Sequence, residues 1–289
     1  MYHRLYPLLA RTPLPLCHAL GYLLGSLTAL IPNTVQRITA INIRRCFPEL
    51  HHAAQQRLIR QSLIEDGKTL CELPLLLSCH ADKFSELIHS VSGEESLKSA
   101  IAAEQGVIII APHLGAWEII GLYCAKNYGI TSLYRPPRQA ELEIPIKKGR
   151  ERFGAELVPT TPQGVRALYK ALSSHKMIGI LPDQDPREAD GYFAPFFGHA
   201  ANTMTLLTRL QQKSSAQPIL AYAERLGWGR GFHIHLQTAE EITPDLDTLS
   251  SITALNRAIE ALVRRCPAQY QWGYRRFRTR PAGEPAFYS

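Results

Sequence analysis

The chain has 289 residues, of which 45% are apolar and 20% are charged, and this composition excludes a largely disordered protein. Its six cysteines are scattered without a Cys-x-x-Cys pair, which excludes a dense disulfide framework and favours a reducing compartment. The net charge of +7 suits an anionic partner, such as an anionic lipid surface or an acidic protein. Nucleic acid is not expected as a partner, because the sequence has no zinc-finger spacing, aromatic RNA-binding signature or basic repeat.

The first distinctive segment, residues 14–31, is an apolar stretch without a formal charge. As a helix it would rise about 27 Å, close to the hydrocarbon thickness of a bilayer. Pro15, His18, Gly21 and Gly25 leave a second interpretation open, a buried or interfacial helix. Both interpretations attach the protein to a membrane.

Positive charge beside this stretch predicts its orientation. More arginines lie just after it than before it: Arg37, Arg44 and Arg45 against Arg4 and Arg11. Because positively charged flanks stay on the cytoplasmic side, the main domain is expected there. We therefore divide the chain into a membrane-spanning or membrane-associated helix in residues 1–34 and a cytoplasmic domain in residues 35–289.

Beyond residue 48 the apolar pattern changes along the chain. Residues 48–77 have helical spacing, which predicts one or two amphipathic helices. Short apolar runs then predict strands at 107–111, 130–134, 156–159, 177–181, 218–223 and 232–238. Longer segments predict helices at 116–126, 139–153, 162–173, 203–213 and 251–265. This alternation predicts an α/β fold with a largely parallel sheet flanked by helices, whose sites gather at the carboxyl ends of strands.

His113 and Glu118 follow the first of these strands. On one continuous helix the two side chains would point about 140° apart. With His113 in a loop and Gly115 permitting a tight turn, the Glu118 carboxylate could reach the imidazole. Such a carboxylate supports general base catalysis, because it fixes the tautomer and stabilises the imidazolium. Spacing alone leaves open a loop histidine beside an ordinary helix glutamate.

The letters around this pair carry a family resemblance. The segment HLGAWE at 113–118 resembles the His-x4-Glu block of the glycerolipid acyltransferase superfamily, and more closely the version in the lipid A late acyltransferases. Further segments resemble other blocks of that family in the same order: NIRRCFPEL at 42–50, LYRPP at 133–137, PDQ at 182–184, PFFG at 195–198 and QYQW at 269–272. Leu114 stands where the family usually has phenylalanine, and Pro112 where a small or polar residue is commoner. Neither departure removes a catalytic atom.

The resemblance implies an O-acyltransferase at the cytoplasmic face of a bacterial inner membrane, acting on a hydroxyl of a lipid A precursor. His113 would be the general base and Glu118 its orienting partner, so that the hydroxyl attacks a thioester carbonyl directly. Arg135 is expected to bind a phosphate of the acceptor or the developing oxyanion. Asp183 is expected to orient the acceptor or a neighbouring cation, or to cap a turn.

The remaining implied residues concern the acyl chain and its donor. Gly115, Phe196, Phe197 and Gly198 are expected to contact substrate, the aromatic pair as the wall of an acyl slot. The implied donor is the thioester of an acyl carrier protein, and no cofactor is expected. Because such carriers are acidic, Arg275, Arg276 and Arg278 are candidates for docking one, which predicts weaker donor affinity at high salt.

Neither a covalent intermediate nor a metal is expected. The sequence has no Gly-x-Ser-x-Gly elbow, and no cysteine lies near His113 in sequence. His233 and His235 could share one face of a strand, but a third ligand at suitable spacing is missing from the sequence.

Three alternatives stay open. The acceptor could instead be a lysophospholipid, an aminolipid or a glycolipid, because the motifs indicate the type of reaction more specifically than the identity of the acceptor. The chain could be a lipid-binding protein without turnover, although the intact His113 and Glu118 disfavour this. It could also be a thioester hydrolase, which would release free fatty acid without acceptor. The chain length, the acylated position, the choice between carrier protein and coenzyme A, and the oligomeric state follow from none of these patterns.

Overall fold

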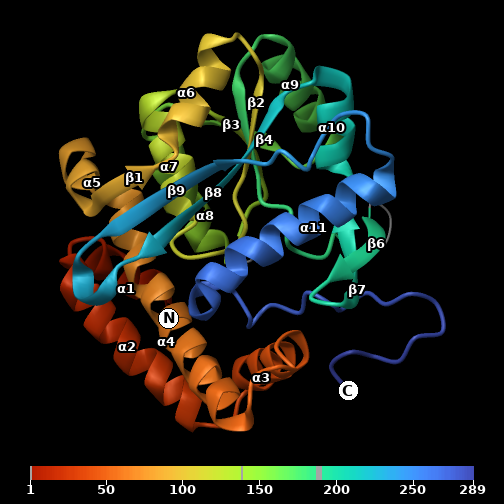
Figure 1. Cartoon of the computed structure of the whole chain (residues 1–289). Helices are drawn as coiled ribbons and strands as arrows, with labels where there is room; N and C mark the ends of the chain where they lie inside the picture. Colours follow the sequence, from red (N-terminus) through yellow and green to blue (C-terminus); the bar gives the residue numbers. More distant parts are fainter. Residues whose placement is uncertain (1, 138, 187–190) are drawn as a thin grey trace.

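A seven-stranded sheet forms the centre of the protein (Figure 1). The computed structural model describes residues 2–137, 139–186 and 191–289. The strand order is β1-β9-β8-β2-β5-β3-β4, and in the described chain every neighbouring pair is parallel except β8 and β9. These strands are β1 (Ile88–Ser92), β2 (Val107–Ile110), β3 (Thr131–Tyr134), β4 (Glu156–Pro159), β5 (Met177–Ile180), β8 (Gln217–Arg225) and β9 (Phe232–Thr238). The expected α/β fold with a largely parallel sheet is confirmed.

Helices cover both faces of this sheet. They are α1 (Tyr2–Leu9), α2 (Leu14–Leu30), α3 (Thr34–Cys46), α4 (His52–Ser78), α5 (Ala81–Leu87), α6 (Glu94–Ala102), α7 (Glu118–Asn127), α8 (Glu143–Glu151), α9 (Pro162–Ser173), α10 (Leu206–Ser214) and α11 (Thr248–Arg265). The described residues also form the short 3-10 helices η1 (Ala140–Leu142), η2 (Gly227–Gly229) and η3 (Pro267–Gln269). A separate antiparallel hairpin consists of β6 (Gly191–Phe196) and β7 (His199–Met204).

The central strand β2 explains why the sheet is buried on both sides. Ile108 and Ile110 enter one apolar core, which side chains from α3, α9, α10 and α11 complete. Val107 and Ile109 point the other way, into a second core with side chains from α5, α6 and α7. Because alternate residues meet helices on opposite faces, the strand is a continuous apolar run. This is the pattern from which the strand was predicted.

Strand β1 and the β6–β7 hairpin are among the elements that were not predicted from the sequence. Strand β1 has the sequence IHSVS, whose polar residues hide its apolar alternation. The helix expected from residue 203 begins at Leu206, because the chain up to Met204 pairs with β6 in the hairpin.

Helix α2 packs along α4 through backbone contact (Figure 1). A Cβ added at Gly21 would lie 2.4 Å from Lys68 Cα, and one added at Gly25 would lie 2.3 Å from Leu63 O. From the other side, a Cβ at Gly67 would lie 2.3 Å from Gly21 O. Small residues are what such a close helix crossing requires.

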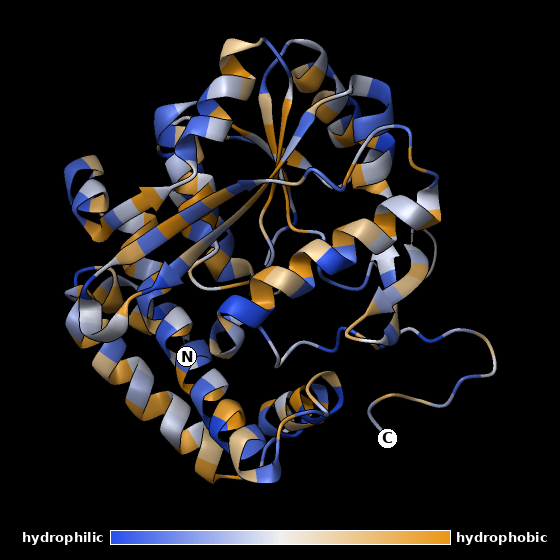
Figure 2. Ribbon diagram, viewed as in Figure 1, coloured by the Kyte–Doolittle hydropathy of each residue, from blue (hydrophilic) through white to orange (hydrophobic). Residues whose placement is uncertain are grey.

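The outward side of α2 is apolar, and the helix is mostly orange and pale in Figure 2. Its exposed apolar side chains, together called the α2 ridge, are Leu16, Leu20, Tyr22, Leu23, Leu24, Leu27 and Leu30. Within the described chain, no individual helix has both the length and the hydropathy for a membrane crossing. Helices α2 and α3 meet these two criteria only jointly, and they are bent by 82° at their break.

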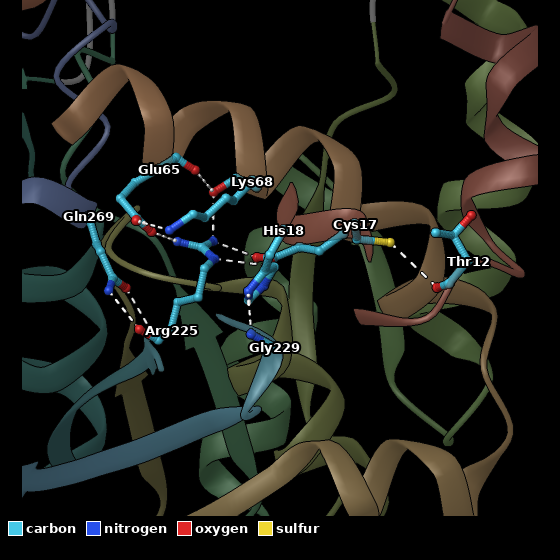
Figure 3. A network of polar contacts seen from close by, with 10 residues as sticks. Thr12, Cys17, His18, Glu65, Lys68, Arg225, Gly229 and Gln269 are labelled. Carbon is cyan, nitrogen blue, oxygen red and sulfur yellow. Dashed lines mark hydrogen bonds and ion pairs between the residues drawn. The ribbon is translucent and has the colours of Figure 1, made fainter. Parts of the chain in front are cut away.

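A buried ion network joins α2 and α4 to the end of β8 (Figure 3). Arg225 donates from Nε to Glu72 Oε2 over 2.8 Å and from Nη1 to Glu65 Oε2 over 2.8 Å. His18 Nε2 lies 2.9 Å from the same Glu72 oxygen, and its Nδ1 accepts the Gly229 N–H. Burial alone would raise the pKa of Glu72, but the charge and hydrogen bonds of Arg225, with those of His18, hold it below its usual value. Glu72 is therefore a buried carboxylate that depends on Arg225.

We predict that Arg225→Met lowers the free energy of unfolding by about 3–5 kcal/mol, because Glu72 loses the buried positive charge that compensates it and keeps only its contact with His18. Urea denaturation would measure the change. The matched control is Lys83→Met, which breaks the exposed pair with Glu86 and should cost less than about 1 kcal/mol. Similar losses in the two variants would contradict a structural role for the buried network.

Candidate active site

His113 and Asp183 meet at the carboxyl edge of the sheet. His113 follows β2 and Asp183 follows β5, and these two strands are parallel neighbours. The His113 backbone N–H donates to Asp183 Oδ2 over 3.0 Å. Its ring Nδ1 lies 2.9 Å from Asp183 Oδ1. One carboxylate thus holds both the backbone and the imidazole of His113.

The charge of Asp183 fixes where His113 carries its proton. Burial alone would raise the pKa of Asp183, but His113 and hydrogen bonds from its ring and backbone keep that pKa below its usual value. An ionised carboxylate only accepts hydrogen bonds, so Nδ1 of His113 is the protonated nitrogen. Gln184 Nε2 lies 3.2 Å from His113 Nε2 and also donates to Gln271 Oε1 over 2.9 Å. The Nε2 lone pair of His113 is therefore available as a proton acceptor once Gln184 moves aside.

The loop after His113 is fixed by backbone hydrogen bonds to two other segments. The Gly115 N–H donates to Gln269 O over 2.9 Å, and the Ala116 N–H donates to Ala223 O over 2.8 Å. The Gln269 side chain bonds both the N–H and the carbonyl of Arg225. Gly115 has a φ of +63°, which confirms the tight turn expected there. Through Gln269, the loop is connected to the buried Arg225 network.

Glu118 does not contact His113 as the sequence predicted. It is the first residue of α7, and its carboxylate accepts hydrogen bonds from Arg150 on α8, including one of 2.9 Å from Nε to Oε2. The expected proximity rested on a tight turn at Gly115 and on the resemblance to the His-x4-Glu block, whereas the start of α7 directs the Glu118 side chain toward α8. Asp183 is the carboxylate that bonds Nδ1 of His113. Glu118 instead places a paired arginine beside His113.

A cavity of about 580 Å³ opens beside His113. Its polar part includes Glu118, Arg150 and Arg135, so the sequence-predicted Arg135 does face the same cavity as His113. The remainder is largely apolar, with Ile109, Ile120, Leu122, Ile130, Leu133 and Leu157 among its lining. A volume of this size suits a drug-sized or lipid-like ligand. The cavity therefore combines a charged part with apolar walls next to a proton-accepting nitrogen.

The aromatic residues predicted to line an acyl slot lie elsewhere. Phe196 and Phe197 are buried in the core and pack against Trp272 and other rings, and neither lines the cavity. Phe197 and Gly198 form the turn between β6 and β7, where both have positive φ angles of 49° and 74°. Two successive positive φ angles are what a tight two-residue hairpin turn needs. These three residues therefore build the hairpin, which corrects the expected role.

One of the three arginines predicted to dock a carrier protein is buried. Arg276 is 3% exposed and donates to Asn202 O and Thr203 Oγ1. Its guanidinium ties the hairpin to the C-terminal segment and is out of reach for a docking partner. Arg275 and Arg278 are exposed.

No group of three or more His, Cys, Asp or Glu side chains that could hold a metal ion occurs in residues 2–137, 139–186 and 191–289. His233 and His235 stack on each other with their ring centroids 4.0 Å apart. Arg150 is the site residue that sequence analysis missed, and no motif marks it. Gln184, Gln269 and Gln271 lie inside segments that the resemblance covers, but nothing in those segments indicates which side chain contacts His113.

Comparison with known proteins gives a consistent result. The sequence profile of the family described as bacterial lipid A biosynthesis acyltransferase matches residues 2–279. The lipid A biosynthesis palmitoleoyltransferase of Escherichia coli K12 is 25% identical over 280 residues, which covers 96% of this chain and 89% of that protein. The lauroyltransferase of the same organism is 24% identical over 97% of this chain and 91% of its own length. The phosphatidylinositol mannoside acyltransferase of Mycolicibacterium smegmatis is 27% identical over 57% of this chain and 53% of its own length.

We predict that Gly115→Ala destabilises the protein more than Gly129→Ala. Both glycines have positive φ, +63° and +78°, so each alanine pays a backbone cost of about 1–2 kcal/mol. At Gly115 the new Cβ would also lie 2.0 Å from Ala223 O, whereas at Gly129 it meets nothing within 4 Å. Thermal or urea unfolding of both variants checks this, and equal destabilisation would show that the loop is not held against β8.

Proposed function

The chain belongs to the bacterial lipid A biosynthesis acyltransferase family, and we propose that it transfers a fatty acyl chain from an acyl carrier protein thioester to a hydroxyl of a lipid A precursor, with His113 as general base. The observation that carries the catalytic part is the bond between His113 Nδ1 and the ionised Asp183, next to the cavity. The two relatives from Escherichia coli, matched over almost the whole chain, support the acceptor class.

The proposed step begins when the acceptor hydroxyl replaces the Gln184 amide at His113 Nε2. His113 removes the hydroxyl proton while the oxygen attacks the thioester carbonyl, and Asp183 stabilises the imidazolium that forms. The C–S bond then breaks, and the imidazolium returns the proton to the departing thiolate. A new ester and a free thiol result, so the step consumes no metal or cofactor.

The lining of the cavity suits the two substrates of this step. Its apolar lining suits an acyl chain, and the guanidinium groups of Arg135 and Arg150 suit a phosphate of the acceptor or the oxyanion. Glu118 raises the pKa of Arg150 by its negative charge, so this arginine keeps its own charge beside the site. We propose that Glu118 contributes to the reaction by positioning Arg150.

The surface suggests how the substrates arrive. We propose that the α2 ridge attaches the protein to the cytoplasmic face of the inner membrane, because exposed leucines on one side of a helix gain free energy in a lipid interface. The exposed Arg275 and Arg278 stay as proposed contacts for an acidic carrier protein.

A second acceptor is favoured by one observation. The partial match to a phosphatidylinositol mannoside acyltransferase supports a glycolipid as this alternative acceptor. A parallel assay with a glycolipid acceptor would distinguish the two candidates.

We predict that His113→Ala lowers kcat by about 10²- to 10⁴-fold, because the general base is lost. Asp183→Asn should have a similar effect on kcat, since its amide can no longer stabilise the imidazolium. Glu118→Gln should instead raise the KM for the acceptor more than it lowers kcat, because Glu118 acts through Arg150. The assay is acyl transfer from acyl carrier protein to a purified lipid A precursor in detergent.

The controls for these variants are circular dichroism and thermal unfolding, which show whether each one is folded. Glu118→Gln combined with Arg150→Gln should be little worse than either change alone, as expected for coupled residues. Full activity in His113→Ala would exclude the proposed base. A kcat loss confined to Glu118→Gln, with Asp183→Asn unaffected, would restore Glu118 as the partner of His113.

We predict that changing Leu16, Leu23 and Leu27 of the α2 ridge to Ser weakens binding to phospholipid vesicles. Each removed side chain lowers the apolar area that is buried in the interface, and each Å² of that area contributes about 25 cal/mol to the binding free energy. Co-sedimentation with vesicles measures the bound fraction. The control is Leu249→Ser, which removes an exposed leucine from α11. Unchanged sedimentation of the triple variant would exclude the ridge as the attachment surface.

A further inference from the structure

Helix α7 follows the loop from His113 to Trp117 and forms part of one wall of the cavity. Glu118, Gly121 and Leu122 line the cavity, and their spacing of three and four residues puts them on one helix face. Glu118 lies in the charged part of the cavity, and Gly121 is one helical turn farther along. Ile109 and Ile130 are also in the lining, so the cavity has apolar walls as well as a charged part.

Gly121 leaves an open space on this wall. A Cβ built at Gly121 meets no other atom within 4 Å. Gly179, the other glycine in the cavity lining, is different, because a Cβ there would lie 2.8 Å from Ser132 Oγ and 3.0 Å from Ile130 Cδ1. Tight packing therefore explains why position 179 is a glycine, but it does not explain the glycine at position 121.

Glycine inside a helix is unfavourable, because the unfolded chain gains conformational freedom from it. The glycines of α2 and α4 offset this helix cost by allowing the two backbones to touch. A Cβ at any of these positions would lie only 2.3–2.4 Å from the facing helix. Gly121 lies in the interior of α7 and makes no such contact. What this glycine provides is space in the cavity.

We propose that Gly121 determines which donor acyl chains fit, because the space beside it receives the distal part of the chain being transferred. This inference rests on the proposed acyl transfer. The thioester carbonyl must lie near His113 Nε2, and the chain attached to it has to leave the charged part of the cavity for the apolar walls. A side chain at position 121 would project into that path and shorten it.

The test is a series of Gly121→Ala, Gly121→Leu and Gly121→Met, assayed with carrier-protein thioesters of 10, 12, 14 and 16 carbons in competition. Mass spectrometry of the products gives the chain-length profile. We expect the preferred chain to become shorter as the side chain grows. In Gly121→Met, kcat/KM for the donor preferred by the wild type should fall about 10- to 200-fold, the range for misfit of a methylene in an apolar pocket. A shorter donor should be used nearly as well as before.

The matched control is Lys126→Met, the same new side chain on the exposed side of α7, which should keep the wild-type profile. Gly121→Ala should also raise the melting temperature, because alanine favours the helix and has room there. A lower melting temperature would mean that the space beside Gly121 is not open. This variant keeps the proposal testable if the larger ones fold poorly.

Thermal-shift binding of free fatty acids of the same four lengths provides a readout that needs no acceptor. A wild-type profile in folded Gly121→Met, in both transfer and binding, would overturn the inference while leaving the proposed transfer intact. A changed acceptor KM with an unchanged donor profile would also overturn it. If the wild type transfers no acyl chain to the lipid A precursor but its fatty acid profile still shortens in Gly121→Met, the proposed acceptor is wrong and the chain-binding role of this space stands.

Discussion

The buried pair of Arg225 and Glu72 is the constraint on which the arrangement of this protein depends. Removing two charges from water costs several kcal/mol for each ion, so the pair has to be fully bonded to be tolerated. Arg225 meets this demand by also bonding Glu65 and Thr69 on α4. The same Glu72 bonds His18 on α2, and this fixes the N-terminal helix against the domain. The guanidinium of Arg225 therefore links β8 to α4, and Glu72 extends this link to α2.

The position of the loop from His113 to Ala116 follows from that constraint and from the order of the strands. Strand β2 lies between β8 and β5, so the chain leaving it passes between the ends of both neighbours. Asp183 after β5 holds His113 from one side. From the other side, Gln269 and Ala223 of β8 accept the N–H groups of Gly115 and Ala116. Gln269 in turn bonds the backbone of Arg225. The geometry at His113 is thus set by strand order and by the ion network together.

The fold was readable from the sequence, and the internal contacts of the site were less so. Strands such as 107–110 are buried on both faces, and this leaves an unmistakable apolar run. The contact between His113 and Asp183 joins residues 70 positions apart and depends on β2 and β5 being neighbours, which no local pattern encodes. The turn at Gly115 and the resemblance to the His-x4-Glu block suggested Glu118 in its place, although the start of α7 turns that side chain toward Arg150. Arg276 was taken for a surface charge because burial of a single arginine depends on tertiary contacts alone.

The hydrogen bond from Gln184 to Nε2 of His113 has a consequence for the empty enzyme. The side-chain oxygen Oε1 of Gln271 accepts from the same Gln184 amide and orients it, so the lone pair of His113 Nε2 is already occupied before any substrate arrives. A stray water has to break this amide contact before it can lose a proton to His113. The proposed acceptor lipid would meet the same barrier, but the arginines and apolar walls of the cavity offer it further contacts. In the proposed reaction, this contact would disfavour hydrolysis of the donor, because an acceptor alcohol that binds elsewhere in the cavity can displace Gln184 more readily than water can.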